Sequence, residues 1–265
     1  MPEKNDTLFL TMIEKRDVRK EFLTKMIVKS IHSKSILSKS KVADYSLNPY
    51  IGCMHGCIYC YAKFMKRFTG HREAWGAFVD VKTNAASLLQ YELRRKTPGK
   101  VWLSGTCDPY QPIEERTKIT QECLRLLSQY EWPVTVQTKS PLILRDLDLL
   151  AKSQRIDVVI SITTANDMVR KVFEPYAPSI PDRLQALTTL HASGIPTSAM
   201  IAPLLPSSEE LLPQLHDIVE FIIIDKMNYQ NLNKPYLGYQ LSDICPICHQ
   251  HIETHGVHIH HVQEI

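Results

Sequence analysis

The strongest constraint on the fold is an alternation that runs through the chain from about residue 100 onward. Short apolar runs rich in β-branched residues are separated by stretches in which apolar residues recur with helical spacing. We expect strands at residues 101–105, 133–138, 157–162, 196–201 and 221–224, with an earlier strand through residues 45–50. Strands that alternate with helices are typical of parallel βα units. The six strands therefore predict an α/β fold with a curved parallel sheet, open or partly closed.

Four stretches between these strands carry the helical spacing. Within each stretch, the following side chains lie on one face of the expected helix: in the first, Ile119, Cys123, Leu126 and Leu127; in the second, Leu184, Leu187 and His191; in the third, Leu88, Leu89 and Leu93; and in the fourth, Leu211, Leu212 and Leu215. Gly194 is expected to end the second of these helices. We expect Asn84 and Ser208 to cap the third and fourth, because their side-chain oxygens can accept hydrogen bonds from the free amides of a first turn.

Length and composition predict one large α/β domain with short appendages. A chain of 265 residues with 44% hydrophobic content can bury a full core. We assign residues 1–44 to an N-terminal extension packed on the outside of the sheet, residues 45–230 to the core and residues 231–265 to a Cys/His-rich tail. The net charge of +3 argues neither for nor against a nucleic-acid partner. No apolar run approaches the roughly 20 residues of a membrane span and no signal-peptide pattern is present, so we expect a cytoplasmic protein.

Five of the seven cysteines fall into two tight groups, which favours metal binding over a disulfide framework. Cys53, Cys57 and Cys60 follow the spacing C-x3-C-x2-C. Thiolates are the ligands that iron clusters prefer, and a full cluster usually takes four, so three leave one iron open to a cofactor or substrate. Gly52 and Gly56 let the loop wrap closely around a bulky inorganic group. The alternative is a zinc site formed by the three cysteines and His55.

At these residues the sequence resembles the radical S-adenosylmethionine (radical SAM) superfamily, whose motif is C-x3-C-x2-C with an aromatic residue, here Tyr59, before the last cysteine. The resemblance implies a partial (β/α)6 barrel of the TIM type and a [4Fe-4S] cluster whose unique iron chelates S-adenosylmethionine. It further implies reductive cleavage of that cofactor to methionine and a 5'-deoxyadenosyl radical, which abstracts hydrogen from a substrate. The resemblance also implies an external one-electron reductant of the flavodoxin or ferredoxin type as a partner.

A narrower likeness covers roughly residues 35 to 225. The segments SILSKSK, NPYIGCMHGCIYCYAKFMKRFTGHREAWGAFVDVK, WLSGTCDPYQPIEE and VQTKS resemble the spore photoproduct lyase-like group, also called DNA repair photolyase-like. Its best-understood member reverses a thymine dimer, whereas most relatives have no assigned substrate. A nucleic acid is therefore one candidate substrate, and radical modification of a protein, peptide or RNA is the alternative.

Polar residues at the ends of the predicted strands are the remaining candidates for the site, because barrel enzymes place their chemistry there. By resemblance, Ser104, Gly105 and Thr106 bind the amino group of the cofactor, Lys139 lies near its carboxylate, and Ser161 binds its ribose or carboxylate. The alternatives are a tight turn, a solvated lysine and a hydroxyl bonded to the sheet.

Cys107 follows the second of the predicted strands, where the photoproduct lyase has a hydrogen-donating cysteine. We expect Cys107 to donate hydrogen to a substrate radical, since a thiol has a weak S–H bond. The alternative is a small buried residue without a chemical role.

Positive charge and aromatic surface are mixed just after the cysteine loop. Lys63, Lys66, Arg67, His71 and Arg72 are interleaved there with Phe64, Phe68 and Trp75. Such a mixture can hold a phosphate backbone and stack bases. It is equally typical of a solvated helix face with an apolar underside.

The C-terminal tail holds a second set of metal-binding side chains. Cys245 and Cys248, followed by His249 and His251, have the residue types of a structural zinc site. The alternatives are an auxiliary cluster and a loose tail with incidental metal affinity. If both cysteine groups bound only zinc, the protein would be a non-enzymatic interaction module.

Overall fold

The structure is a computed structural model and describes residues 26–224 and 258–261. Its main feature is an eight-stranded sheet with the strand order β11-β10-β9-β8-β7-β6-β3-β2. In chain order these strands are β2 (Leu37–Lys39), β3 (Tyr45–Leu47), β6 (Val101–Leu103), β7 (Val134–Thr138), β8 (Ile156–Ser161), β9 (Thr197–Ile201), β10 (Phe221–Ile224) and β11 (His258–His261).

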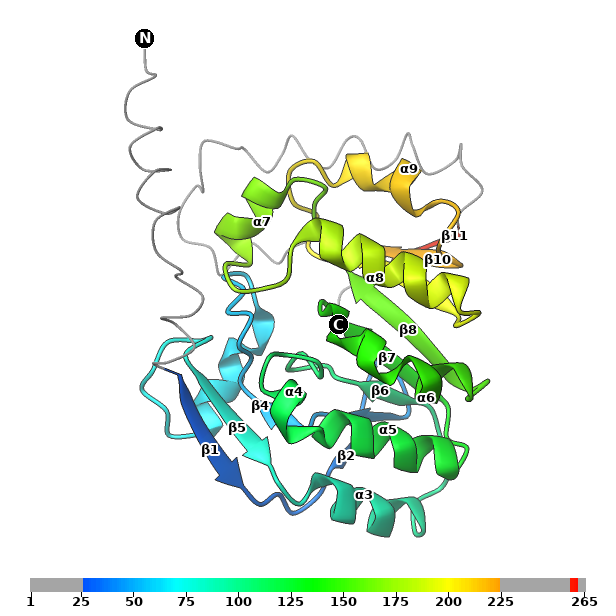
Figure 1. The fold of residues 1–265 in the computed structure, drawn as a ribbon. Helices are drawn as coiled ribbons and strands as arrows, with labels where there is room; N and C mark the ends of the chain where they lie inside the picture. Colours follow the sequence, from blue (N-terminus) through cyan, green and yellow to red (C-terminus); the bar gives the residue numbers. More distant parts are fainter. Residues whose placement is uncertain (1–25, 225–257, 262–265) are drawn as a thin grey trace.

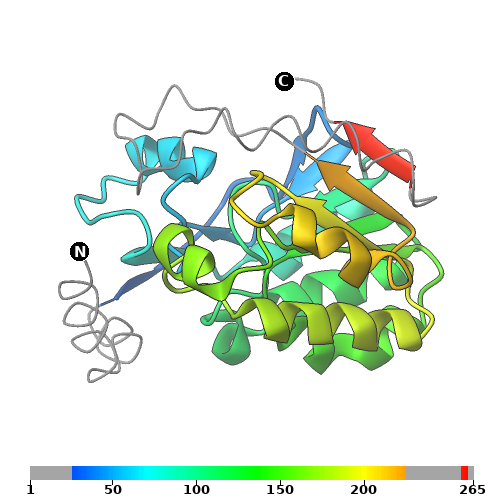
Figure 2. The same cartoon turned by 90° about the horizontal axis from the view of Figure 1, so that it is seen from above.

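From β3 to β11 every neighbouring pair in this sheet is parallel, and only β2, at one edge, is antiparallel to its neighbour. The six strands expected from the sequence are β3, β6, β7, β8, β9 and β10, and they are neighbours in that order. The sheet curves into a partial barrel (Figures 1 and 2). The predicted α/β fold with a partly closed parallel sheet is confirmed.

The helices are α3 (Ala85–Leu93), α4 (Glu114–Thr117), α5 (Ile119–Gln129), α6 (Leu147–Ala151), α7 (Asp167–Phe173), α8 (Ile180–Ala192) and α9 (Leu212–Leu215), with 3-10 turns η1 (Tyr61–Phe68), η2 (Pro141–Asp146) and η3 (Glu209–Leu211). Helices α3, α5, α6, α8 and α9 pack on the outer side of the curved sheet (Figure 1), whereas α7 packs on residues 58 and 59. In the part of the chain that the structure describes, no helix has the length and apolar character needed to cross a membrane.

A second, three-stranded sheet lies beside the start of the barrel. It pairs β5 (Phe78–Lys82) with β1 (Ile27–Ile31) on one side and with β4 (Tyr50–Ile51) on the other. Residues 27–39, which the sequence assigns to an extension outside the sheet, therefore contribute strands β1 and β2. The boundary at residue 44 stays a prediction, and the one at residue 230 lies outside the described residues.

Both predicted helix caps are wrong in detail. Asn84 precedes α3, but its side chain accepts from the Ser33 amide (2.9 Å) and donates to the Ser33 carbonyl (2.9 Å), so it binds the segment after β1. Ser208 makes no side-chain bond to the helix that follows. That helix is divided into η3 and α9 because Pro213, at the start of α9, has no amide hydrogen to continue the bonding pattern.

The two faces of the barrel strands differ in character. On the outer face, buried side chains such as Val136 and Ile160 pack in one core with helix residues such as Leu127 and Leu187. On the inner face, a row of hydrogen bonds crosses neighbouring strands from Trp102 on β6 through Gln137 on β7 to Ser161 on β8. The interior of the barrel is thus lined with polar groups.

Candidate functional site

The cysteine loop runs from the end of β4 to the start of η1. Two backbone bonds close its turns, from the Gly56 amide to the Cys53 carbonyl and from the Cys60 amide to the Cys57 carbonyl, each 3.2 Å long. Gly52 and Gly56 have positive φ angles of 91° and 61°. A Cβ at Gly52 would lie 2.4 Å from the Phe78 carbonyl oxygen, and one at Gly56 would lie 2.9 Å from the Tyr176 ring. Both positions therefore need glycine.

Gln111, which the sequence did not single out as a site residue, fixes the first half of this loop. Its side chain is fully buried, accepts a bond from the Met54 amide (2.9 Å) and donates to the Gly52 carbonyl (3.3 Å). Gln111 lies in the WLSGTCDPYQPIEE segment, but no local pattern distinguishes it there from an ordinary turn residue.

The three loop thiols lie in a setting that suits a shared cluster. Cys53 and Cys57 are buried and Cys60 is partly exposed. Burial raises the pKa of all three, that of Cys57 to about 12, and the nearby Asp108, Cys57 and Cys60 raise the pKa of Cys53 further. The three thiols therefore lie near one another, and the neighbouring cations do not lower their pKa values enough to ionise them. A bound metal would do so, because its positive charge displaces the thiol protons.

A buried donor beside Cys60 points to a sulfur-rich ligand. The buried indole Nε1 of Trp75 makes no hydrogen bond of ordinary length and angle to a described residue. It lies close enough to the Cys60 sulfur to act as a weak donor, which lowers the pKa of that thiol. A buried N–H without an acceptor is costly, whereas a thiolate or cluster sulfur at Cys60 would provide one. Two features of the loop therefore fit an iron–sulfur cluster: its three thiols and the indole N–H of Trp75, for which a cluster sulfur would be an acceptor.

A zinc site formed with His55 does not fit. Within residues 26–224, no group of three or more Cys, His, Asp or Glu side chains converges on one metal ion, as a tetrahedral site requires. The thiolates of a cluster bind different iron atoms, so they need not converge. His55 is buried, and its Nδ1 lies 3.3 Å from Asp108 Oδ2.

Asp108 joins the cysteine loop to the ends of two barrel strands. Besides facing His55, its carboxylate accepts bonds from the Thr138 hydroxyl (2.6 Å) and from the backbone amides of Tyr110 (2.9 Å) and Lys139 (2.8 Å). Burial would raise the pKa of Asp108, but the interaction with His55 and these hydrogen bonds outweigh it and lower the pKa to about 2. Asp108 is therefore an ionised anchor for the site.

The segment after β6 brings the predicted cofactor-binding residues next to Cys107. The Ser104 hydroxyl lies 3.0 Å from the Cys107 sulfur, the Thr106 amide donates to Asn48 (2.8 Å), and the Gly105 carbonyl accepts a bond from the Tyr61 hydroxyl. Burial raises the pKa of Cys107 to about 11, so it is a protonated thiol at neutral pH.

Tyr59 and Lys139 meet at a carboxylate that the sequence analysis missed. Glu174 is fully buried and accepts bonds from the hydroxyls of Tyr59 and Thr163 and from the guanidinium of Arg183, and its Oε1 lies 3.6 Å from Lys139 Nζ. Burial opposes ionisation of Glu174, but the charges of Arg183 and Lys139 prevail and lower its pKa to about 2. We call Tyr59, Lys139, Thr163, Glu174 and Arg183 the buried ion-pair network.

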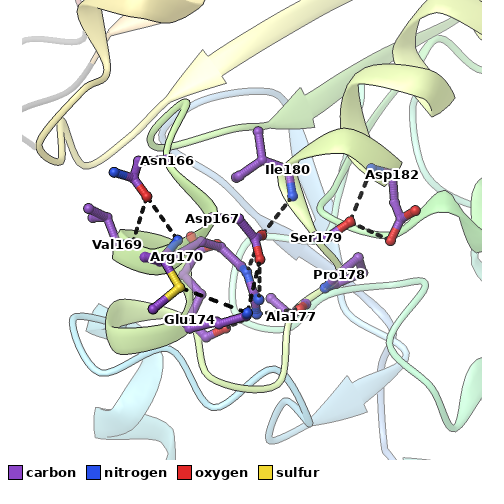
Figure 3. Close-up of polar contacts among 12 residues, drawn as sticks. Asn166, Asp167, Val169, Arg170, Glu174, Ala177, Pro178, Ser179, Ile180 and Asp182 are labelled. Carbon is purple, nitrogen blue, oxygen red and sulfur yellow. Dashed lines mark hydrogen bonds and ion pairs between the residues drawn. The ribbon is translucent and has the colours of Figure 1, made fainter. Parts of the chain in front are cut away.

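The α7–α8 segment holds Glu174 in place (Figure 3). Asn166 caps α7 by accepting from the amides of Met168 and Val169. Arg170 pairs with Asp167 (2.8 Å) and donates to the carbonyls of Glu174 (3.3 Å) and Ala177 (3.1 Å). The backbone is therefore held before Glu174 by the cap of α7 and after it by the bonds from Arg170.

Ser161 lies on the inner face of the barrel, as the alternation along β8 predicts. It is 2% exposed, and its hydroxyl accepts from Gln137 Nε2 at 3.2 Å. A role in cofactor binding stays a prediction, as it does for Ser104, Gly105, Thr106, Lys139 and Tyr59. Cys245, Cys248, His249 and His251 lie outside the described residues, so the zinc hypothesis stays a prediction too.

A partly closed parallel barrel with its thiol loop and polar groups at the strand ends has the architecture of a barrel enzyme. The profile of the Radical SAM superfamily matches residues 47–219, more than half of the chain. The chain therefore belongs to the Radical SAM superfamily, and the family predicted from the C-x3-C-x2-C motif is confirmed. An iron–sulfur cluster and S-adenosylmethionine are the cofactors that this family implies.

Known proteins with similar sequence or fold agree with that assignment. An uncharacterized protein of Methanocaldococcus jannaschii is 35% identical over 185 residues, which are 69% of this chain and 70% of that protein. Among solved structures, a spore photoproduct lyase mutant with bound AdoMet and dinucleoside spore photoproduct has a TM-score of 0.60 at 17% identity, covering 79% of this chain and 64% of that chain. SuiB of Streptococcus suis bound to S-adenosylmethionine has a TM-score of 0.57 at 14% identity, covering 93% and 53%. At such low identity these structures show a shared fold, and this chain spans less than two thirds of either.

Proposed function

We propose that Cys53, Cys57 and Cys60 hold a [4Fe-4S] cluster with which the protein cleaves S-adenosylmethionine and starts hydrogen abstraction from a substrate at the barrel mouth. The observation that carries this proposal is the loop itself, with its three thiols and the unsatisfied Trp75 donor beside Cys60. Such a cluster would supply one electron to the sulfonium, whose bond to the 5' carbon would break to give methionine and a 5'-deoxyadenosyl radical.

The chain's own residues would position the cofactor. Ser104, Gly105 and Thr106 follow β6, and Ser161 ends β8, so both groups lie at the C-terminal edge of the sheet. Lys139, at the end of β7, is the cation available to a cofactor carboxylate, although it shares its charge with Glu174 at 3.6 Å. Tyr59 stays fixed by its bond to Glu174. A cytoplasmic location accompanies this proposal, because free thiols persist in a reducing compartment.

Anaerobic reconstitution tests the proposal directly. We expect the protein to bind iron and sulfide, and to convert S-adenosylmethionine to 5'-deoxyadenosine when dithionite is added. Cys57→Ala should abolish this turnover and lower the iron content. Cys123→Ala is the matched control, because Cys123 is a buried cysteine in the helical core and not on the loop. A reconstituted, iron-loaded protein that leaves S-adenosylmethionine intact would refute the proposal.

Cys107 is the proposed hydrogen donor to the substrate radical. Its thiol keeps its proton at neutral pH and packs beside the apolar cluster that includes Met54 of the cysteine loop. Because solved structures of the same fold hold a dinucleoside spore photoproduct, that dinucleoside is the first substrate to try. We expect Cys107→Ala to keep cleavage of S-adenosylmethionine and to alter the products made from the dinucleoside. An unchanged product distribution and turnover would remove Cys107 from the mechanism.

A further inference from the structure

The turn η1, which starts directly after Cys60, presents an unusual surface. We call it the basic–aromatic surface, and it consists of Tyr61, Lys63, Phe64, Lys66, Arg67, Phe68 and Arg72. Residues 61–72 contain four Lys or Arg and no Asp or Glu. None of these four cations forms an ion pair with a described residue; Lys63 and Lys66 instead donate to the backbone carbonyls of Ile58 and Arg72. The positive charge is therefore uncompensated within the described part of the chain.

Aromatic side chains stand out from the same surface. Tyr61 and Phe68 are each 67% exposed and Phe64 is 41% exposed. The Arg67 guanidinium lies 5.3 Å from the centre of the Phe64 ring and 5.0 Å from that of Phe68, so it is held between two rings. Arginine and aromatic residues in such an arrangement are enriched where proteins dock. His71, expected to belong to this group, is instead buried and bonded to Asp80 and Glu73.

The position of this surface relative to the cysteines narrows what it could bind. Cys53 and Cys57 are buried, whereas Cys60 is partly exposed and directly precedes η1. Lys63 binds the loop at the Ile58 carbonyl, and Tyr61 reaches the Gly105 carbonyl at the barrel mouth. In Figure 2, η1 is the cyan helical segment at the rim of the molecule. A partner bound to η1 would thus sit beside the most exposed cluster ligand.

We propose that the basic–aromatic surface is the docking site of an acidic one-electron carrier protein. The proposal rests on the proposed function, since it requires a cluster on Cys53, Cys57 and Cys60. One electron passes from the reduced carrier to the cluster, and no proton or group is exchanged in that step. Complementary charge favours fast, short-lived encounters, which suits a carrier that must leave after each transfer. Electron transfer weakens steeply with distance, which favours docking beside Cys60.

A nucleic acid is the rival occupant, because cations and exposed rings also bind single strands. The extent and position of the charge favour the carrier. The four cations are confined to ten residues, 63–72, directly after Cys60. Strong nucleic-acid binding usually requires a longer track of phosphate contacts.

The experiment compares two electron donors on the reconstituted holoenzyme. The test variant is Arg67→Glu/Arg72→Glu. The matched control is Lys152→Glu/Arg155→Glu, which changes the charge equally on two exposed residues that precede β8, at the opposite end of the barrel strands. Cluster reduction is followed by stopped-flow absorbance with reduced flavodoxin and, separately, with dithionite. We expect the test variant to slow reduction by flavodoxin about tenfold or more at low salt, with a weaker salt dependence, while the control variant reacts like the wild type.

The dithionite arm separates the two proposals. If the wild-type protein takes up electrons from dithionite but does not cleave S-adenosylmethionine, the proposed function fails. If it cleaves the cofactor and the test variant reacts with flavodoxin as fast as the wild type, the docking site is refuted. Equal slowing with both donors would also refute it, because the charge change would then act on the cluster itself and not on the encounter with the carrier. Anisotropy with a labelled oligothymidine checks the rival: binding lost in the test variant, with flavodoxin reduction unchanged, would assign the surface to nucleic acid.

Discussion

Two groups of charged residues lie at the cysteine loop, and their charges are compensated in different ways. The buried ion-pair network surrounds Glu174 with Arg183, Lys139 and two hydroxyls, so that a fully buried charge has a partner on each oxygen. The basic–aromatic surface instead gathers four cations that form no ion pair with a described residue. A buried charge is costly unless it is paired, whereas an exposed one costs little. Loss of one partner from the network should therefore destabilise the fold, whereas the cations of the surface are free to bind a partner.

The largest loss of stability should come from breaking the buried ion-pair network. Glu174→Gln keeps the shape of the side chain but leaves Arg183 buried without its counter-charge. We expect the free energy of unfolding in urea to fall by about 3–5 kcal/mol. The matched exposed pair gives the comparison: Glu122→Gln, which breaks the bond to Arg125, should cost at most about 1 kcal/mol.

If Glu174→Gln does not fold well enough to measure, Glu174→Gln/Arg183→Met still tests the idea. Replacing both partners of a buried pair with uncharged groups is often nearly neutral. The double variant should therefore recover much of the lost stability. A double variant as unstable as the single one would show that the uncompensated charge of Arg183 is not the source of the effect and would assign it to Lys139, the other cation at Glu174.

Low pH should remove the contribution of ionised Glu174 to the free energy of unfolding. The pKa of Glu174 is lowered from 4.5 to about 2, so its ionised form stabilises the fold above about pH 4.5 and loses this effect as the pH falls toward 2. Between about pH 6 and pH 2, the gap in unfolding free energy between wild type and Glu174→Gln should narrow by about 3 kcal/mol. Urea titrations at several pH values measure it. A gap that stays constant would contradict the assigned pKa.

The sequence predicted the barrel well because its evidence is local. Each strand is a short apolar run, and the alternation of Val136 and Ile160 with Gln137 and Ser161 predicts which side chains face the helices and which face the interior. The three thiols were likewise found from their spacing alone. Both signals are carried by residues close together in the chain.

Glu174, Gln111 and Asn48 could not be found in this way. Glu174 is 115 residues from Tyr59, and Gln111 is 57 from Met54, so only the folded chain brings them to the loop. Asn84 shows the reverse error: a sequence pattern typical of a cap was present, but the nearby Ser33 backbone offered the side chain better partners. Contacts across the fold, which no local pattern encodes, complete the site.

Trp75 should affect the cluster more than the stability of the fold. Its buried N–H makes no hydrogen bond of ordinary length and angle to a described residue and lies beside Cys60. Trp75→Phe removes a hydrogen bond that would stabilise the reduced, more negative cluster. We expect the midpoint potential of the reconstituted cluster to become more negative, measured by a redox titration followed by EPR. An unchanged potential would place the indole away from the cluster sulfurs.

The smallest effect on stability should come from the basic–aromatic surface. Arg67→Ala removes the guanidinium between Phe64 and Phe68, and contacts of this kind at exposed sites are worth about 0.5–1 kcal/mol. We therefore expect the unfolding free energy in urea to change by less than about 1 kcal/mol, while reduction by flavodoxin slows. A loss as large as that of Glu174→Gln would break the comparison, because it would make Arg67 a structural residue. A small loss joined to slower reduction would instead show that this charge is retained for a partner and not for the fold.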